Sequence, residues 1–189
     1  MIILIRHALP DIDYSRCCVE IAEARLKEYN STEKLHLKQI VSLKNELSAV
    51  VPGNEKAIIY ASNLPRAITT ARYLFDPSRF DININPIFSE FELAIIKVPF
   101  VQFSLKNWFV ISRIAWCLGF YQNCSSFRKE IMRAKKAMHL LKAGGDKGKT
   151  IVLVGHGFMN RCIKIYLKKE GWVVPQDKRY GDLDILLPG

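Results

Sequence analysis

Three short apolar runs, each followed by polar or glycine residues, constrain the fold of this 189-residue chain more than any other feature. They are Ile2–Ile5, Ala57–Ala61 and Thr150–Val154. Short runs rich in β-branched side chains are typical of strands that are buried on both faces of a parallel sheet. Segments with helical periodicity lie between the runs, and strands that alternate with helices predict an α/β fold with a mostly parallel sheet.

Further elements are predicted from apolar periodicity and from capping residues. A helix is expected over Val19–Tyr29, and a second helix is expected to begin at Asn30, which can cap it because Glu33 stands three residues later. Asp81–Asn85 alternates polar residues with isoleucine and predicts an edge strand, and Leu183–Leu187 predicts a last strand.

The composition is that of a globular protein with a substantial core. Hydrophobic residues make up 49% of the chain and charged residues 24%, and a chain of this length is expected to form one domain over residues 1–189. The expected architecture is a three-layer sandwich, in which helices cover both faces of the central sheet.

The net charge of +10 favours an anionic partner, such as a phosphorylated metabolite, a nucleic acid or an acidic membrane surface. A nucleic-acid interface is not expected, because the basic residues are spread along the chain instead of forming a dense stripe with interleaved aromatic residues. The cysteines lack metal-ligand spacing and the N-terminus lacks a secretory pattern, so a reduced, cytoplasmic setting is expected. These cysteines are Cys17, Cys18, Cys117, Cys124 and Cys162.

Leu93–Tyr121 is the most apolar and aromatic part of the chain. Its apolar run is interrupted by Lys97, Lys106 and Arg113, and Pro99 would break a helix. A membrane-spanning helix needs about 20 nearly uninterrupted apolar residues. We therefore expect no transmembrane segment here.

Candidate functional side chains follow the predicted strands at the points where these strands end. Because the carboxyl ends of parallel strands meet at one edge of a sheet, these side chains are expected to lie together. Arginine binds oxyanions through paired hydrogen bonds, and histidine can act as a nucleophile or base, so the set predicts phosphate chemistry. The candidates are Arg6 and His7 after the first run, Ser62 and Arg66 after the second, His156 after the third, and Glu90 after the edge strand.

Two members of this set admit more than one role. Ser62 is expected to cap the helix that follows the second strand, with Pro65 in its first turn, so that Arg66 stands at a helix N-terminus that favours anions. The carboxylate that acts as acid or base is assigned to Glu90, and Glu92 remains the alternative.

Three motifs occur in one order along the chain. They are Leu-Ile-Arg-His-Ala at residues 4–8, Ser-Asn-Leu-Pro-Arg-Ala-Ile-Thr-Thr-Ala at 62–71 and Gly-His-Gly at 155–157. In these motifs the chain resembles the histidine phosphatase superfamily, which includes the cofactor-dependent phosphoglycerate mutases. The resemblance extends over nearly the whole chain and implies a phosphoglycerate mutase-like fold.

The resemblance also implies a mechanism. His7 would attack the phosphoryl group to form phosphohistidine, and Glu90 would protonate the leaving oxygen and then activate water, with no metal and no cofactor. Fixed cations stabilise the negative charge that spreads over the oxygens of the transferring group. The residues expected to bind the substrate are Arg6, Arg66, His156, Gly157 and Ser62.

Two departures from the family pattern bear on the activity. Ala8 replaces the usual glycine, and the stretch after Glu90 lacks the glycine pattern of the mutases. Residues 93–143 are instead expected to form a helical cover over the site. These features favour a phosphatase that acts on a small organic phosphate, with an apolar or bulky group as a further hypothesis.

Several alternatives remain at this stage. A phosphoglycerate mutase-type phosphoryl transfer and a phosphatase for phosphorylated protein side chains are the enzymatic ones. A non-catalytic protein that binds a phosphate ligand, or attaches peripherally to a membrane through residues 93–121, is another. A homodimer is also possible.

Overall fold

The computed structural model describes residues 1–50, 57–120, 124–175, 179–180 and 183–189. Its centre is a mixed, seven-stranded sheet. Six strands follow the order β4-β3-β6-β1-β9-β7, and the seventh strand, β8, pairs with β9. Four neighbouring strands, β4, β3, β6 and β1, run parallel, and β9 joins β1 in the antiparallel direction. The strands are β1 (Ile2–Arg6), β3 (Ile58–Ala61), β4 (Ile82–Ile84), β6 (Ile151–Gly155), β7 (Trp172–Val173), β8 (Arg179–Tyr180) and β9 (Leu183–Pro188).

The predicted strands are confirmed, each to within two residues at its ends. The three apolar runs form β1, β3 and β6, which lie side by side in the sheet. All five residues of β6 are buried, as expected for a strand covered on both faces. The alternating segment forms β4 at the edge of the sheet, and the last predicted strand is β9.

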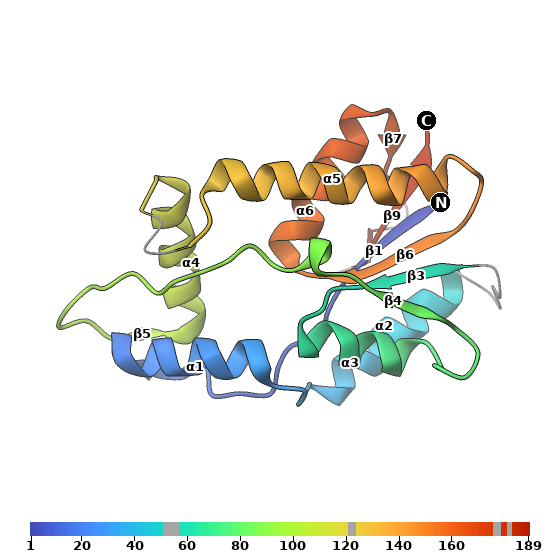
Figure 1. Cartoon of the computed structure of the whole chain (residues 1–189). Helices are drawn as coiled ribbons and strands as arrows, with labels where there is room; N and C mark the ends of the chain where they lie inside the picture. Colours follow the sequence, from blue (N-terminus) through green and yellow to red (C-terminus); the bar gives the residue numbers. More distant parts are fainter. Residues whose placement is uncertain (51–56, 121–123, 176–178, 181–182) are drawn as a thin grey trace.

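Helices cover both faces of the sheet and complete the expected three-layer α/β sandwich (Figure 1). Alternate side chains of β1 divide between the two layers. Ile2 and Leu4 pack with Met138 and Ile163 of the helices on one face, whereas Ile3 and Ile5 join the core of the opposite face. The covering helices are α5 (Phe127–Gly145) and α6 (Gly157–Lys169) on the first face, and α2 (Leu37–Val50) and α3 (Pro65–Leu74) on the second.

A third apolar cluster lies beside the sandwich, between α1 (Val19–Ser31) and α4 (Leu105–Cys117). Ala22 of α1 and Trp108 of α4 are completely buried there, and the short strands β2 (Arg16–Cys17) and β5 (Phe103–Ser104) pair close by. Within the expected cover segment 93–143, α4 takes this outlying position while α5 packs on the sheet. Residues 121–123 of that segment lie outside the described residues.

The predicted helix that begins at Asn30 is wrong. Asn30 lies in the last turn of α1, which continues to Ser31, and the next helix begins only at Leu37. The Asn30 side chain accepts a hydrogen bond from Arg66 instead of capping a helix. A contact with a residue 36 positions away therefore overrides a local capping signal.

Ser62 does not cap α3, contrary to the prediction. Leu64 is the N-cap residue and Pro65 begins the helix, as first-turn proline permits. The Ser62 hydroxyl accepts a hydrogen bond from the Leu64 backbone N–H and lies 2.7 Å from His156 Nε2. Helix α5 is capped by Ser126, whose side chain accepts a hydrogen bond from the Lys129 N–H.

No helix in the part of the chain that the structure describes is long and apolar enough to cross a membrane. The longest apolar stretch is divided between an extended segment and α4, which has 13 residues.

The two methionines of α5 provide a matched test of the core. Met138 is completely buried, and Met132 is 56% exposed on the same helix. Met138→Ala is expected to lower the free energy of unfolding by about 2–5 kcal/mol, because it leaves a cavity between α5 and the sheet. Met132→Ala should change it by less than about 0.5 kcal/mol. Urea denaturation measures both, and equal effects would contradict the placement of α5.

Candidate active site

The ends of β1, β6 and β3 carry the two histidines and Ser62 to one edge of the sheet, as the sequence predicts. The strand pairing continues one residue beyond the strands, because the His7 N–H donates to the Gly155 carbonyl and the Ser62 N–H donates to the Val154 carbonyl, each at 3.0 Å. The His7 and His156 rings consequently lie edge to face, with their centroids 5.0 Å apart.

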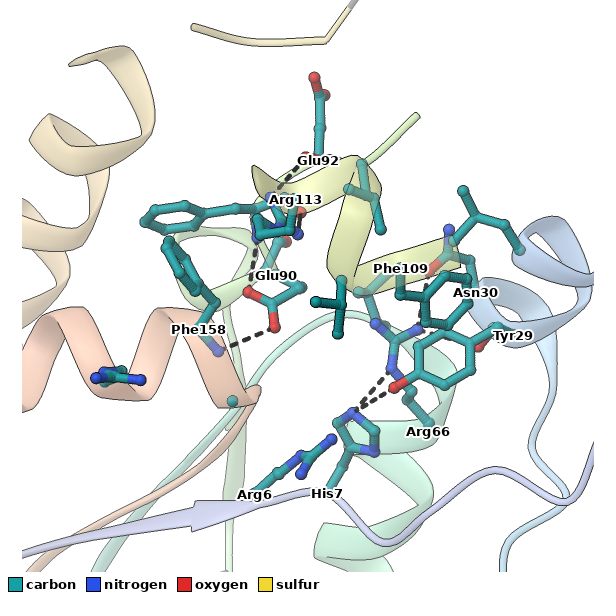
Figure 2. Close-up of a pocket in the computed structure, with 18 of the residues that line it drawn as sticks. Arg6, His7, Tyr29, Asn30, Arg66, Glu90, Glu92, Phe109, Arg113 and Phe158 are labelled. Carbon is teal, nitrogen blue, oxygen red and sulfur yellow. Dashed lines mark hydrogen bonds between the residues drawn. The ribbon is translucent and has the colours of Figure 1, made fainter. Parts of the chain in front are cut away.

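The environment of His7 determines where its proton lies. Its Nδ1 is 2.8 Å from the Ala8 carbonyl oxygen, which can only accept, and its Nε2 is 3.1 Å from Arg66 Nε, which can only donate. Nδ1 therefore carries the hydrogen and Nε2 presents its lone pair (Figure 2). The Tyr29 hydroxyl lies 3.5 Å from the same nitrogen.

Both histidines are held in the neutral state. Burial lowers the pKa of His7 well below its usual value, and the charges of Arg66 and Arg6 lower it further. Burial likewise lowers the pKa of His156, with His7 and Arg66 as additional causes. Neutral His7 retains the lone pair that a nucleophile needs.

Arg66 connects His7 to α1. It is only 1% exposed, and its Nη1 donates to the Tyr29 carbonyl and to Asn30 Oδ1, each at 3.1 Å. The guanidinium also lies over the Tyr29 ring, 4.4 Å from its centroid. Its side chain is thus fixed in direction by three partners, with Nε aimed at His7.

Ala8 is fixed by α3. Its N–H donates to Thr70 Oγ1 at 3.0 Å, and the Thr70 hydroxyl donates to the Arg66 carbonyl at 2.7 Å. Ala8 is completely buried, so its carbonyl is held in place beside His7 Nδ1. The alanine that departs from the family motif is therefore accommodated by ordinary packing.

His156 and Ser62 form a buried pair behind His7. Both are 0% exposed, and neither lines the cavity in this structure. His156 Nδ1 is buried and has no hydrogen-bond partner in the structure. An unpaired buried ring nitrogen is costly unless a ligand satisfies it.

Glu90 and Glu92 occupy different positions along the cavity. Glu90 lies at the N-terminus of α6, where its Oε2 accepts from the Phe158 N–H and its Oε1 from the Met159 N–H, each at 3.2 Å. Glu92 is exposed, accepts from the Ser125 N–H at 2.7 Å, and points away from His7 (Figure 2). The geometry thus favours Glu90 over Glu92 as the carboxylate nearer to the histidine.

Arg133 of α5 holds the segment that carries Glu90. Its guanidinium donates to the carbonyls of Ile87, Ser89 and Glu90 at 2.9, 2.8 and 3.3 Å, and it forms an ion pair with Glu130. The segment follows a short 3₁₀ turn, η1 (Pro86–Phe88), and has no regular structure of its own. Arg133 therefore positions Glu90 through the backbone.

A cavity of about 810 Å³ opens in front of these residues. Its polar side includes Arg6, His7, Arg66, Glu90 and Gly157. A Cβ on Gly157 would lie 3.4 Å from Arg6 Nε, so the start of α6 lies directly beside the arginine. The opposite wall is apolar and is formed by Leu26, Leu64, Leu93, Phe109, Val110, Ile114 and Phe158.

Several lining residues could not be identified from sequence. Tyr29 and Asn30 come from α1, Phe109 and Arg113 come from α4, and no local motif marks any of them. Leu64 and Phe158, which also line the cavity, are marked in the sequence, because Leu64 lies inside the motif at residues 62–71 and Phe158 directly follows the Gly-His-Gly motif. Among the described residues, no group of three or more His, Cys, Asp or Glu side chains could hold a metal ion.

Comparisons with known proteins identify the family and the fold of this chain. The model of the histidine phosphatase superfamily (branch 1) matches residues 2–175. No curated protein matches the sequence. Among solved structures, a putative alpha-ribazole-5'-P phosphatase from Escherichia coli is 19% identical, with a TM-score of 0.57 over 88% of this chain and 78% of its own. A mycobacterial glucosyl-3-phosphoglycerate phosphatase in complex with VO3 is 18% identical, with a TM-score of 0.54 over 89% and 81%.

The lowered pKa values of the two histidines predict a pH-dependent stability. Below a pH of about 6.5 the two histidines bind protons in the unfolded chain but stay neutral in the folded chain. The free energy of unfolding should therefore fall as the pH falls from about 6.5 toward the lowered pKa values of the folded state. Urea denaturation at pH of about 7.5 and about 5.5, on either side of the ordinary histidine pKa of about 6.5, measures this decrease in the free energy of unfolding. The double variant His7→Asn/His156→Asn should show a smaller decrease, and an unchanged decrease would contradict the assignment.

Proposed function

The chain belongs to the histidine phosphatase superfamily, and we propose that it is a phosphomonoester hydrolase that acts through a phosphohistidine at His7. The observation that carries the proposal is the tautomer of His7. The Ala8 carbonyl holds the hydrogen on Nδ1, and the lone pair of Nε2 is directed to the charged end of the cavity. A preoriented, neutral imidazole is what nucleophilic attack on phosphorus requires.

The phosphoryl group would bind between Arg6, Arg66 and His156. In this step the Arg66 Nε–H moves its hydrogen bond from His7 Nε2 to a phosphoryl oxygen, which frees the lone pair. The Ser62 hydroxyl donates a hydrogen bond to His156 Nε2. The ring hydrogen of His156 then lies on Nδ1, from which it can be donated to a phosphoryl oxygen. The unpaired Nδ1 supports this role, and it makes Ser62 a positioning residue.

The reaction proceeds in two balanced displacements. His7 Nε2 forms a bond to phosphorus as the ester P–O bond breaks, and Glu90 delivers its proton to the leaving alcohol oxygen. Glu90, now a carboxylate, then takes a proton from water, whose oxygen attacks phosphorus as the P–N bond breaks. Inorganic phosphate leaves, and both side chains return to their starting states. The arginines stabilise the negative charge on the transferring group in both steps.

The apolar wall supports a substrate that carries an apolar organic group. Leucine, valine, isoleucine and phenylalanine side chains make up much of the cavity lining, which also includes Asn30, Arg113 and Arg161. The lining can therefore contact both apolar and polar parts of an organic phosphate. Two structural neighbours of the chain, the alpha-ribazole-5'-P phosphatase and the glucosyl-3-phosphoglycerate phosphatase, are named as phosphatases for small phosphorylated molecules, which supports a phosphatase activity here.

His7→Ala is expected to lower kcat by at least about 10³-fold, because it removes the nucleophile. The measurement is phosphate release from p-nitrophenyl phosphate in the presence of a chelator. A stopped reaction of the native protein with ³²P-labelled substrate should contain acid-labile phosphoprotein that the variant lacks. A folded native protein that releases no phosphate would overturn the hydrolase proposal, and full activity of His7→Ala would overturn the role of His7.

Glu90→Gln and Glu92→Gln form a matched pair that tests the acid. Glu90→Gln should lower kcat by about 10²–10⁴-fold for an alkyl phosphate, whose leaving oxygen needs a proton. The loss should be at least about tenfold smaller for p-nitrophenyl phosphate, because nitrophenolate leaves without help. Glu92→Gln should have little effect on either substrate. The reverse pattern would transfer the role to Glu92.

A further inference from the structure

Helix α4 is apolar on two opposite sides. Its inner side packs in the cluster shared with α1 or against α5 and is buried, with Leu105, Trp108 and Trp116 among its residues. Its outer side is exposed and is also apolar. We define the outer apolar face as Val110 (58% exposed) and Ile114 (55%) of α4, together with Leu118 (73%) and Phe120 (64%), which follow the helix. Large apolar side chains that gather on an exposed surface mark an interaction site, so the outer apolar face indicates a missing partner.

The loop that precedes α4 presents another large apolar side chain. Phe100 is fully exposed, and its φ of 62° places it in the left-handed region that bulky residues rarely adopt. This loop projects from the end of the molecule that also carries β5 and the start of α4 (Figure 1). A turn that directs an aromatic ring into solvent is unfavourable unless the ring has a partner.

Within the segment that carries these apolar residues, the charged side chains have one sign. Residues 93–129 contain no aspartate or glutamate, whereas Lys97, Lys106 and Arg113 lie among them. Lys97 and Lys106 are exposed. From a neighbouring element, Glu20 of α1 interacts with Lys97. The segment thus combines exposed apolar side chains with a positive charge, in a chain whose net charge is +10.

We propose that the outer apolar face and the Phe100 loop dock on an anionic lipid surface. Apolar side chains would enter the interface between headgroups and acyl chains, and the lysines would contact the anionic headgroups. A second copy of the chain fits less well, because a two-fold interface through this face would bring together two surfaces of the same positive charge. Docking of this kind lies on the membrane and does not cross it.

Docking would also place the cavity beside the lipid. Val110 and Ile114 belong to the outer apolar face and line the apolar wall of the cavity at the same time. The apolar wall is therefore continuous with the surface that meets the membrane. The docking itself does not depend on catalysis, so it can be tested whether or not the protein hydrolyses phosphomonoesters.

Vesicle flotation tests the proposal directly. The full chain should float with vesicles of phosphatidylcholine mixed with phosphatidylglycerol, more weakly at high salt, and should not float with phosphatidylcholine alone. Phe100→Asp and Leu118→Asp should each weaken partition by at least about tenfold, because they replace inserted apolar groups by a repelled charge. Val41→Asp is the matched control, since Val41 is 59% exposed on α2.

Three further results would overturn the proposal. These are no flotation with the mixed vesicles, equal flotation of the two face variants and the control, or a dimer by light scattering that Leu118→Asp dissociates. Phe100 and Leu118 do not line the cavity, so both variants should hydrolyse p-nitrophenyl phosphate at the native rate. Flotation without any hydrolysis by the native protein would retain the docking surface and reject only the proposed function.

Discussion

The parallel pairing of β1 with β6 is the interaction on which the site depends. Its register sets Arg6 opposite Gly155, so the residues that follow the two strands, His7 and His156, emerge beside each other. The strands are apolar and completely covered except at this end, where Arg6 is exposed. A shift of one residue would exchange the faces of every side chain in β1 and separate the two rings.

The site also depends on a buried cation, Arg66, whose guanidinium is held with its Nε directed at His7. Arg66 satisfies its guanidinium with a carbonyl and an amide at the end of α1, with the face of Tyr29, and with His7. Desolvation lowers its pKa, and these contacts offset part of the cost of burial. The same contacts tie α1 to α3, so the position of the cation and the packing of the two helices depend on each other.

Glu90, the proposed acid, is positioned in a different way. Glu90 lies on an irregular segment that is anchored in the core by the buried Phe88 and Phe91, and its carboxylate is placed by Arg133 from α5 and by the backbone N–H groups of α6. The position of the Glu90 carboxylate therefore depends on its own segment, on α5 and on α6. The cavity then separates this polar half from an apolar half that α4 contributes, which joins the chemistry to the outer surface of the molecule.

The sequence by itself determined the α/β class, the central strands and the residues at their ends, because buried strands and short motifs leave local patterns in the chain. Only the tertiary structure decided what those side chains contact. Asn30 looked like a helix cap and Ser62 like another, yet they contact Arg66 and His156, 36 and 94 positions away. Such long-range contacts have no period or spacing in the sequence, so the roles of Arg133 and Tyr29 at the site could be recognised only after the chain had folded.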